Sequence, residues 1–173
     1  GPNEPLISIT FPEGMTVADY ARIASKKLSN FNETSFLSYA NDHEGTLFPE
    51  TYFVPDHYTD AALFDLLHAT YNERLSDLAE AIKKHPLSEY EIVILASIIE
   101  REANTPESMK LVSSVLQNRL AIGMALQADA SIEYILEKPL SKLTPGDLKV
   151  NSPYNTYLNK GLPPTPIGNP GLD

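Results

Sequence analysis

The chain has 173 residues, enough to bury one good core with a small second lobe. Its formal net charge of -10 leaves no basic face to release counterions from phosphates, which argues against nucleic acids and anionic membrane surfaces as partners. There is no cysteine, so disulfides give no sign of the compartment, and no apolar run is long enough to span a bilayer.

The first 43 residues have the pattern of a small module. Residues 6–10 alternate between apolar and polar side chains, as a strand does, and a turn follows. Thr16 caps an amphipathic helix over residues 17–28, and a second short helix is expected around residues 35–40. One strand and two helices are too little to fold alone, so we expect this module to pack against the rest of the chain.

Residues 43–58 form a loop-rich segment that is dense in aromatic rings and carboxylates, among them Glu44 and Tyr52. Rings stack on the apolar faces of pyranoses and carboxylates accept sugar hydroxyls, so one interpretation is a sugar-binding groove. In the other interpretation the rings pack into the core and the acids face water. Both can hold at once.

An amphipathic packing helix is predicted next, over residues 60–85, with Thr59 as its N-cap. Its histidines, like those elsewhere in the chain, lack the paired spacing of a metal site. We therefore expect no bound metal ion.

The most informative stretch begins at Ser88, which stands three residues before Glu91 in the spacing of a capping box. The run over residues 92–99 is apolar apart from Ser97, so the helix that carries it should be buried. Glu100 and Glu102 follow at the helix C-terminal end, where the macrodipole and desolvation both favour a protonated acid. In the plainer interpretation both acids are solvated and flank Arg101 on the surface. The pattern leaves two candidate acids.

A second helix over residues 106–122 should pack back on the first, giving a helical hairpin with Glu100 near its tip. Gly123 is expected to end it. The C-terminal stretch from residue 151 is too rich in Pro, Gly and Asn for regular structure, and long structureless segments in compact domains tend to be functional or disordered.

Five strings resemble, in order, the motifs of the endolytic murein transglycosylase family, also called YceG-like. They are EGTLFPETY at 44–52, LASIIEREA at 95–103, VLQNRLAIGMALQAD at 115–129, SPYNTY at 152–157 and GLPPTPIGNPG at 161–171. The resemblance implies an α+β fold, with a mainly helical catalytic domain built on a central helical hairpin and small β elements.

The resemblance also implies a domain division. Residues 1–43 resemble the remainder of a LysM-like module, of which Gly1-Pro2 look like a tag remnant, and residues 44–173 resemble the catalytic domain. We expect that domain to continue beyond Asp173. The family is held on the outer face of the bacterial cytoplasmic membrane by an N-terminal helix that this chain does not include.

The activity that the resemblance implies is endolytic cleavage of the β-1,4 bond between N-acetylmuramic acid (MurNAc) and N-acetylglucosamine (GlcNAc) in peptidoglycan. The products end in 1,6-anhydroMurNAc, and the reaction limits the length of nascent glycan strands. Besides those strands, the implied partners are peptidoglycan synthases. The reaction needs no cofactor.

The family motif maps its catalytic acid onto Glu100 and leaves Glu102 a structural part. Gln127 and Asp129 are kept from a family motif in which Ala128 and Ala130 depart from the usual hydroxyl and proline. As groove residues that orient the sugar we expect Glu44, Tyr52, Gln127, Asp129, Tyr154 and Asn155.

Two rival functions stay open at this point. A hydrolytic muramidase would use a second carboxylate, such as Asp129 or Glu44, to activate water. In a non-catalytic glycan-binding or scaffold module, none of these acids would take part in a reaction.

Overall fold

The computed structural model describes residues 4–171, so Gly1, Pro2 and Asp173 lie outside the described residues. These fall into two compact units, one formed by residues 4–84 and 168–171 and the other by residues 85–167. The fold is mostly helical with a small two-stranded sheet, which confirms the predicted α+β class. Among residues 4–171 no helix is both long and apolar enough to cross a membrane.

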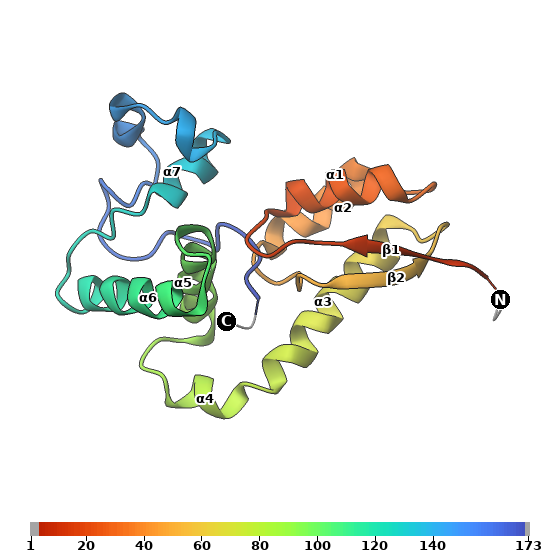
Figure 1. Cartoon of the computed structure of the whole chain (residues 1–173), viewed down its shortest axis with the longest axis horizontal. Coiled ribbons are helices and arrows are strands. Elements are labelled where there is room, and N and C mark those ends of the chain that lie inside the picture. The colour runs from red at the N-terminus through yellow and green to blue at the C-terminus, as the bar shows by residue number, and fades with distance from the viewer. Residues whose placement is uncertain (1–3, 172–173) are drawn as a thin grey trace. The chain divides into compact units, whose positions relative to one another are not determined.

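The first unit carries the sheet and four α-helices (Figure 1). Its elements are β1 (Leu6–Thr10), α1 (Val17–Lys27), α2 (Glu33–Ala40), the 3-10 helix η1 (Asn41–His43), β2 (Thr51–Pro55), α3 (Asp60–Ser76) and α4 (Ala79–Lys84).

The sheet pairs β1 with β2 in antiparallel register, with Ile9 opposite Tyr52 and Ile7 opposite Val54. Side chains alternate across a strand, so Ile9, Tyr52 and Val54 face the core while Phe53 stays exposed. We predicted a loop-rich segment over residues 43–58. The structure differs from that prediction because part of the segment forms the strand β2.

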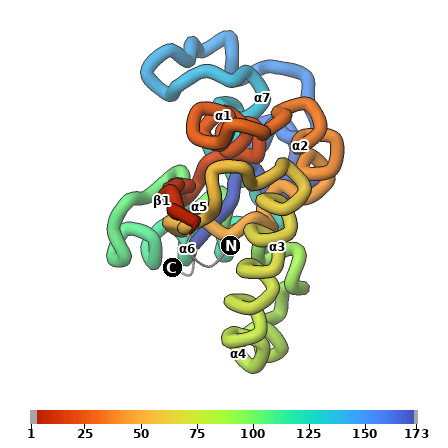
Figure 2. Tube along the Cα trace, turned by 90° about the vertical axis from the view of Figure 1, so that its right-hand side faces the viewer, coloured from red at the N-terminus to blue at the C-terminus, as the bar shows by residue number. Residues whose placement is uncertain are grey.

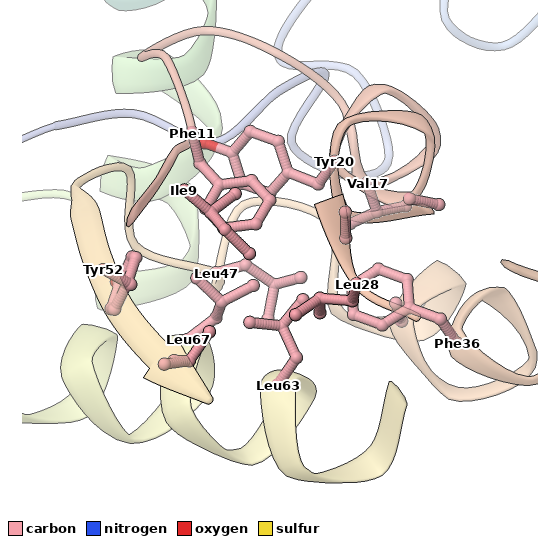
Figure 3. Close-up of a cluster of buried hydrophobic side chains, with 14 residues drawn as sticks. Ile9, Phe11, Val17, Tyr20, Leu28, Phe36, Leu47, Tyr52, Leu63 and Leu67 are labelled. Carbon is pink, nitrogen blue, oxygen red and sulfur yellow. The ribbon is translucent and has the colours of Figure 1, made fainter. Parts of the chain in front are cut away.

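The core of the first unit joins residues from both sides of the domain boundary predicted at residues 43 and 44. Figure 3 shows Phe11 and Tyr20 packed together above Leu47, with Leu63 and Leu67 of α3 beneath it. The Phe11 and Tyr20 ring centroids lie 4.8 Å apart. The sheet and this cluster both include residues from each side of the predicted boundary, and the compact units divide after Lys84. The LysM-like nature of residues 1–43 stays a prediction.

The helix predicted over residues 60–85 is two helices, which Figure 2 shows in succession along the tube. The chain leaves α3 at Asp77 and turns through a hydrogen bond from the Leu78 amide to the Leu75 carbonyl at 3.0 Å. The helix α4 then begins at Ala79. The apolar spacing carries on through this turn, which explains why the pattern predicted one helix.

The second unit is built on the predicted helical hairpin (Figure 1). Its core joins Leu95 and Ile98 to Leu116, Leu126 and Ile167. A tail segment, which we define as residues 151–167, has neither helix nor strand, as predicted. The elements of this unit are α5 (Glu89–Glu102), α6 (Pro106–Ala121), α7 (Asp129–Leu136) and the 3-10 helices η2 (Leu140–Lys142) and η3 (Pro145–Lys149).

Candidate active site

Glu100 lies in the last turn of α5, and local signals fix where that helix begins and ends. The Ser88 hydroxyl accepts the Glu91 amide at 3.2 Å, and Glu91 Oε1 accepts the Ser88 amide at 3.0 Å, which confirms the capping box. At the other end the Ala103 amide donates to the Ile99 carbonyl. Glu100 itself is partly buried, so the residue belongs neither to the core nor to the fully exposed surface.

The face of α5 beside Glu100 binds the tail segment. The hydroxyl of Ser97, which is fully buried, accepts the Ile167 amide at 3.0 Å and donates to the Ile94 carbonyl at 2.6 Å. The Arg101 guanidinium donates to the Ile167 carbonyl at 3.4 Å. Ser97 and Arg101 are one helical turn apart, and residues three or four apart share a helix face. Glu100 therefore lies on the side of α5 along which the tail segment runs.

Glu102, the other acid at the end of α5, ties this helix to α7. Its Oε1 accepts the Ala130 amide at 2.8 Å. Much of the Glu102 side chain is exposed, but burial of the carboxyl group raises its pKa above the ordinary value of 4.5, and the charges of Asp129 and Glu133 act in the same direction. The Ala130 hydrogen bond opposes that rise. The sequence predicted a structural role for Glu102, and the hydrogen bond to the Ala130 amide is a contact of that kind.

Asp129 is the first residue of α7 and accepts a hydrogen bond from the Tyr157 hydroxyl of the tail segment. Burial raises the pKa of Tyr157 to about 12, and the hydrogen bond to Asp129 adds to that rise. The carboxylate of Asp129 thus has a phenol partner inside the second unit.

Gln127 precedes α7 in a left-handed conformation with φ 54°, and it is exposed. Its amide donates to the Thr156 carbonyl at 3.1 Å, and the next amide, of Ala128, donates to Thr156 Oγ1 at 2.9 Å. Ser131 Oγ lies 2.9 Å from the same hydroxyl. These bonds hold the Gln127 loop to the tail segment, so two of the recognised motifs lie side by side.

Tyr154 and Asn155 lie in the tail segment and differ in exposure. Tyr154 is partly exposed, and its hydroxyl lies 2.8 Å from Thr165 Oγ1. Asn155 is fully buried, where its side-chain nitrogen donates to the carbonyls of Leu148 and Val150 at 3.0 and 2.8 Å. This nitrogen thus binds backbone groups, and the predicted part of Asn155 in orienting the sugar stays a prediction.

Glu44 and Tyr52 belong to the other compact unit, and both are buried there. Glu44 Oε2 accepts the Val17 amide at 2.8 Å, and the Tyr52 hydroxyl donates to the Phe48 carbonyl at 2.7 Å. Each side chain is therefore interior in this unit, and the predicted part of Glu44 and Tyr52 in sugar binding stays a prediction. Of the two interpretations of residues 43–58, core packing describes the rings that are buried.

Sequence reasoning missed Ser97, Thr156 and Ile167 as residues that shape this region. One signal was available, because Ser97 is the only polar residue in the apolar run over residues 92–99. A lone hydroxyl in a buried helix needs a partner, and here the partner is the tail segment. Within residues 4–171 no group of three or more His, Cys, Asp or Glu side chains could hold a metal ion.

Curated proteins similar to this chain come from two bacterial genera. A protein of Streptococcus pneumoniae serotype 2 (strain D39 / NCTC 7466), named endolytic murein transglycosylase, is 30% identical over 210 residues, covering 99% of this chain and 38% of its own length. A protein of the same name from Bacillus subtilis (strain 168) is 37% identical over 132 residues, covering 75% of this chain and 36% of its own. The chain thus spans well under half the length of these relatives.

A solved structure is similar in fold as well as in sequence. The 2.6 Å crystal structure of a putative yceG-like protein from Listeria monocytogenes matches with a TM-score of 0.86 and 29% identity, over 96% of this chain and 64% of that one. The model of the YceG-like family matches residues 2–173, nearly the whole sequence. On this match the chain belongs to the YceG-like family.

Proposed function

We propose that this protein is a lytic transglycosylase that cleaves peptidoglycan strands internally, at the β-1,4 bond between MurNAc and GlcNAc. Membership of the YceG-like family supports the proposal, as do the names of relatives that are 30% and 37% identical to it. The chain spans only part of those relatives, so activity and substrate are carried over as a proposal.

The observation that carries the proposal is the setting of Glu100. It is a partly buried acid in the last turn of a capped helix, beside the face on which the tail segment is bound by Ser97 and Arg101. The helix C-terminal end favours the protonated form of an acid, which is the form a proton donor needs.

In the proposed mechanism Glu100 begins protonated and gives its proton to the glycosidic oxygen. The bond from that oxygen to C1 of the muramoyl ring breaks, leaving an oxocarbenium-like centre at C1. The Glu100 carboxylate then takes the proton of the C6 hydroxyl on the same ring, whose oxygen bonds to C1. Glu100 ends protonated as it began, and no water is consumed.

For direct contact with the sugars we propose Gln127, which is exposed, and Asp129 and Tyr154, which are partly exposed. For Glu44, Tyr52 and Asn155 we propose an indirect part, because each is buried and holds backbone groups. Positioning by such groups can contribute a large part of an enzymatic rate.

The proposed setting is the extracytoplasmic face of the bacterial cytoplasmic membrane. There the enzyme would cut nascent glycan strands and so set their length, close to the synthases that extend them. A single-pass anchor and a LysM-like module in the longer protein are parts of this proposal.

The hydrolytic alternative needs a second carboxylate to activate water. The two acids considered for that task are already engaged, Glu44 with the Val17 amide and Asp129 with the Tyr157 hydroxyl. The lytic reaction needs no such acid, because its nucleophile belongs to the substrate. A glycan-binding scaffold would bind strands without converting them.

The test is to incubate the protein with glycan strands and to analyse the products by mass spectrometry. We expect internal cleavage with 1,6-anhydroMurNAc ends, and a loss of at least about a hundredfold in rate for Glu100→Gln, which cannot donate the proton. Glu89→Gln changes an exposed acid at the other end of the same helix and should retain full rate. Reducing ends would instead establish a muramidase, and binding without products a scaffold.

A further inference from the structure

A groove of about 690 Å³ lies on the helical hairpin of the second unit. Ligand pockets in proteins commonly have volumes of this size. One wall is Ile99, the residue before Glu100, and the other is a single face of α6, because its lining positions recur every three or four residues. The residues of that face are Pro106, Met109, Lys110, Ser113 and Ser114.

The lining combines apolar surface with one positive charge. Ile99 and Met109 supply apolar atoms, Ser113 and Ser114 supply hydroxyls, and Lys110 supplies an ammonium group. Among the described residues that line the groove there is no carboxylate. Lys110 is therefore the one charged residue among those that line the groove, in a chain with 23 acidic and 13 basic residues.

We propose that this groove binds the peptide stem of the glycan strand, which rests on the proposed function. The stem is joined to the lactyl ether at C3 of the muramoyl ring, the ring whose C1 reacts at Glu100. A stem therefore extends from the reacting sugar to a neighbouring surface, and the groove is lined by Ile99, the residue that precedes Glu100 in α5.

The chemistry of the groove selects the stem over the sugar backbone. While the stem is attached, its amide bond to the lactyl group leaves the sugars neutral, and they give an ammonium no charge to pair with. A stem has free carboxylates for Lys110 and alanine methyl groups for Ile99 and Met109. Charge complementarity of this kind sets preference between related ligands more than total affinity.

The experiment measures dissociation constants of short glycan strands with the Glu100→Gln protein, which should bind strands without cutting them. One set of strands keeps its stems. In the other set an amidase removes the stems, and the lactyl carboxyl groups exposed by that hydrolysis are capped as methylamides, so that these strands stay neutral. We expect tighter binding of the strands with stems. Lys110→Gln should weaken that binding about two- to fivefold at low salt, the size of an exposed ion pair, and Lys110→Glu should weaken it more.

Three controls separate the groove from other effects. Both Lys110 variants should leave binding of stripped strands unchanged, high salt should abolish the difference between strand types, and Lys149→Gln, at an exposed lysine outside the groove, should behave like the parent protein. Circular dichroism checks that each variant is folded.

Equal affinity for both strand types, or equal weakening of both by Lys110→Gln, overturns the stem site and leaves the lytic function standing. A change in sedimentation by Lys110→Glu also overturns it, because the groove would then join two copies of the chain. If the unmodified protein forms no anhydro ends on either type of strand, the proposed function itself fails.

Discussion

The side-chain amide of Asn169 donates a hydrogen bond to Glu44 Oε2 at 3.3 Å, inside the first compact unit. The two residues are 125 positions apart in the sequence, and both are buried. The same Glu44 oxygen accepts the amide of Val17, the first residue of α1, where a helix dipole favours a negative group. Two motifs recognised in the sequence, EGTLF and GNPG, therefore meet at one buried polar contact.

Asn169→Asp should destabilise the protein, because the change keeps the shape of the side chain and replaces its donor by an oxygen. Asn169 Oδ1 accepts the amides of Gly45 and Leu47 at 2.9 and 3.1 Å, and an aspartate can still accept them. Its second oxygen, however, would face the Glu44 carboxylate and the Met15 carbonyl, which now accept hydrogen bonds. We expect the free energy of unfolding, measured with urea, to fall by about 2–3 kcal/mol.

The matched control is Asn30→Asp, at an exposed asparagine of the same unit, which should change stability by less than about 0.5 kcal/mol. Equal stability of the two variants would show that the Asn169 contact contributes nothing.

Helix starts could be predicted from the sequence because their signals are local. The capping box at Ser88 lies within four residues, and so does the Thr105-Pro106 start of α6. Gly123 ends the hairpin with φ 70°, a conformation that glycine adopts without strain. The hairpin was therefore predictable almost to the residue.

The strand β2 was not predictable in the same way, because its partner is β1, far away in the sequence. Pro49 and Pro55 predict a loop when only neighbouring residues are considered. The segment is a strand because it pairs with β1, with Tyr52 opposite Ile9. The contact of Glu44 was also not predictable, because its partner lies far away in the sequence. An acid in an aromatic-rich segment suggests a sugar contact, and no local signal predicts that Asn169 lies beside it.

Ser97→Ala should loosen the contact between α5 and the tail segment. The change leaves the buried Ile167 amide without its acceptor, and a buried donor that loses its partner costs about 1–3 kcal/mol. The free energy of unfolding should fall by that amount in urea titrations. Hydrogen exchange at the Ile167 amide should also accelerate, which reports on this contact alone.

Ser114→Ala provides the comparison for Ser97. The Ser114 hydroxyl also donates to a carbonyl of its own helix, that of Lys110 at 3.0 Å, but it is exposed. Its removal should be nearly neutral. Hydrogen exchange at Ile167 that is unchanged in Ser97→Ala would contradict the assignment.

Glu102→Gln tests how the raised pKa of Glu102 affects stability. A carboxyl group whose pKa is higher in the folded than in the unfolded protein binds a proton more tightly when folded, so stability falls as the pH rises from 4.5 through the folded pKa. Glutamine stays neutral, and its oxygen can still accept the Ala130 amide. We expect the variant to lose this pH dependence and to exceed the parent protein in stability at pH 7.

Urea titrations between pH 4 and pH 8 measure this difference, which solvent contact of Glu102 keeps modest. Glu107→Gln, at an exposed acid in the first turn of α6, should retain the pH profile of the parent protein. A Glu102→Gln profile parallel to that of the parent would mean that the pKa of Glu102 is not raised.

Tyr157→Phe isolates the ionisation of one phenol. In the folded protein the Tyr157 hydroxyl donates to Asp129, and burial with this bond raises its pKa from 10.0 to about 12. The contribution of the bond to stability is complete below pH 10 and is lost as the pH rises towards 12, because the unfolded chain releases the proton first. Subtracting the ultraviolet absorbance titration of Tyr157→Phe from that of the parent protein should leave a single phenol with its midpoint near 12. A midpoint near 10 would mean that the Tyr157 hydroxyl is neither buried nor bonded to Asp129 in solution, and the tail segment would then lose its link to the start of α7 through this pair.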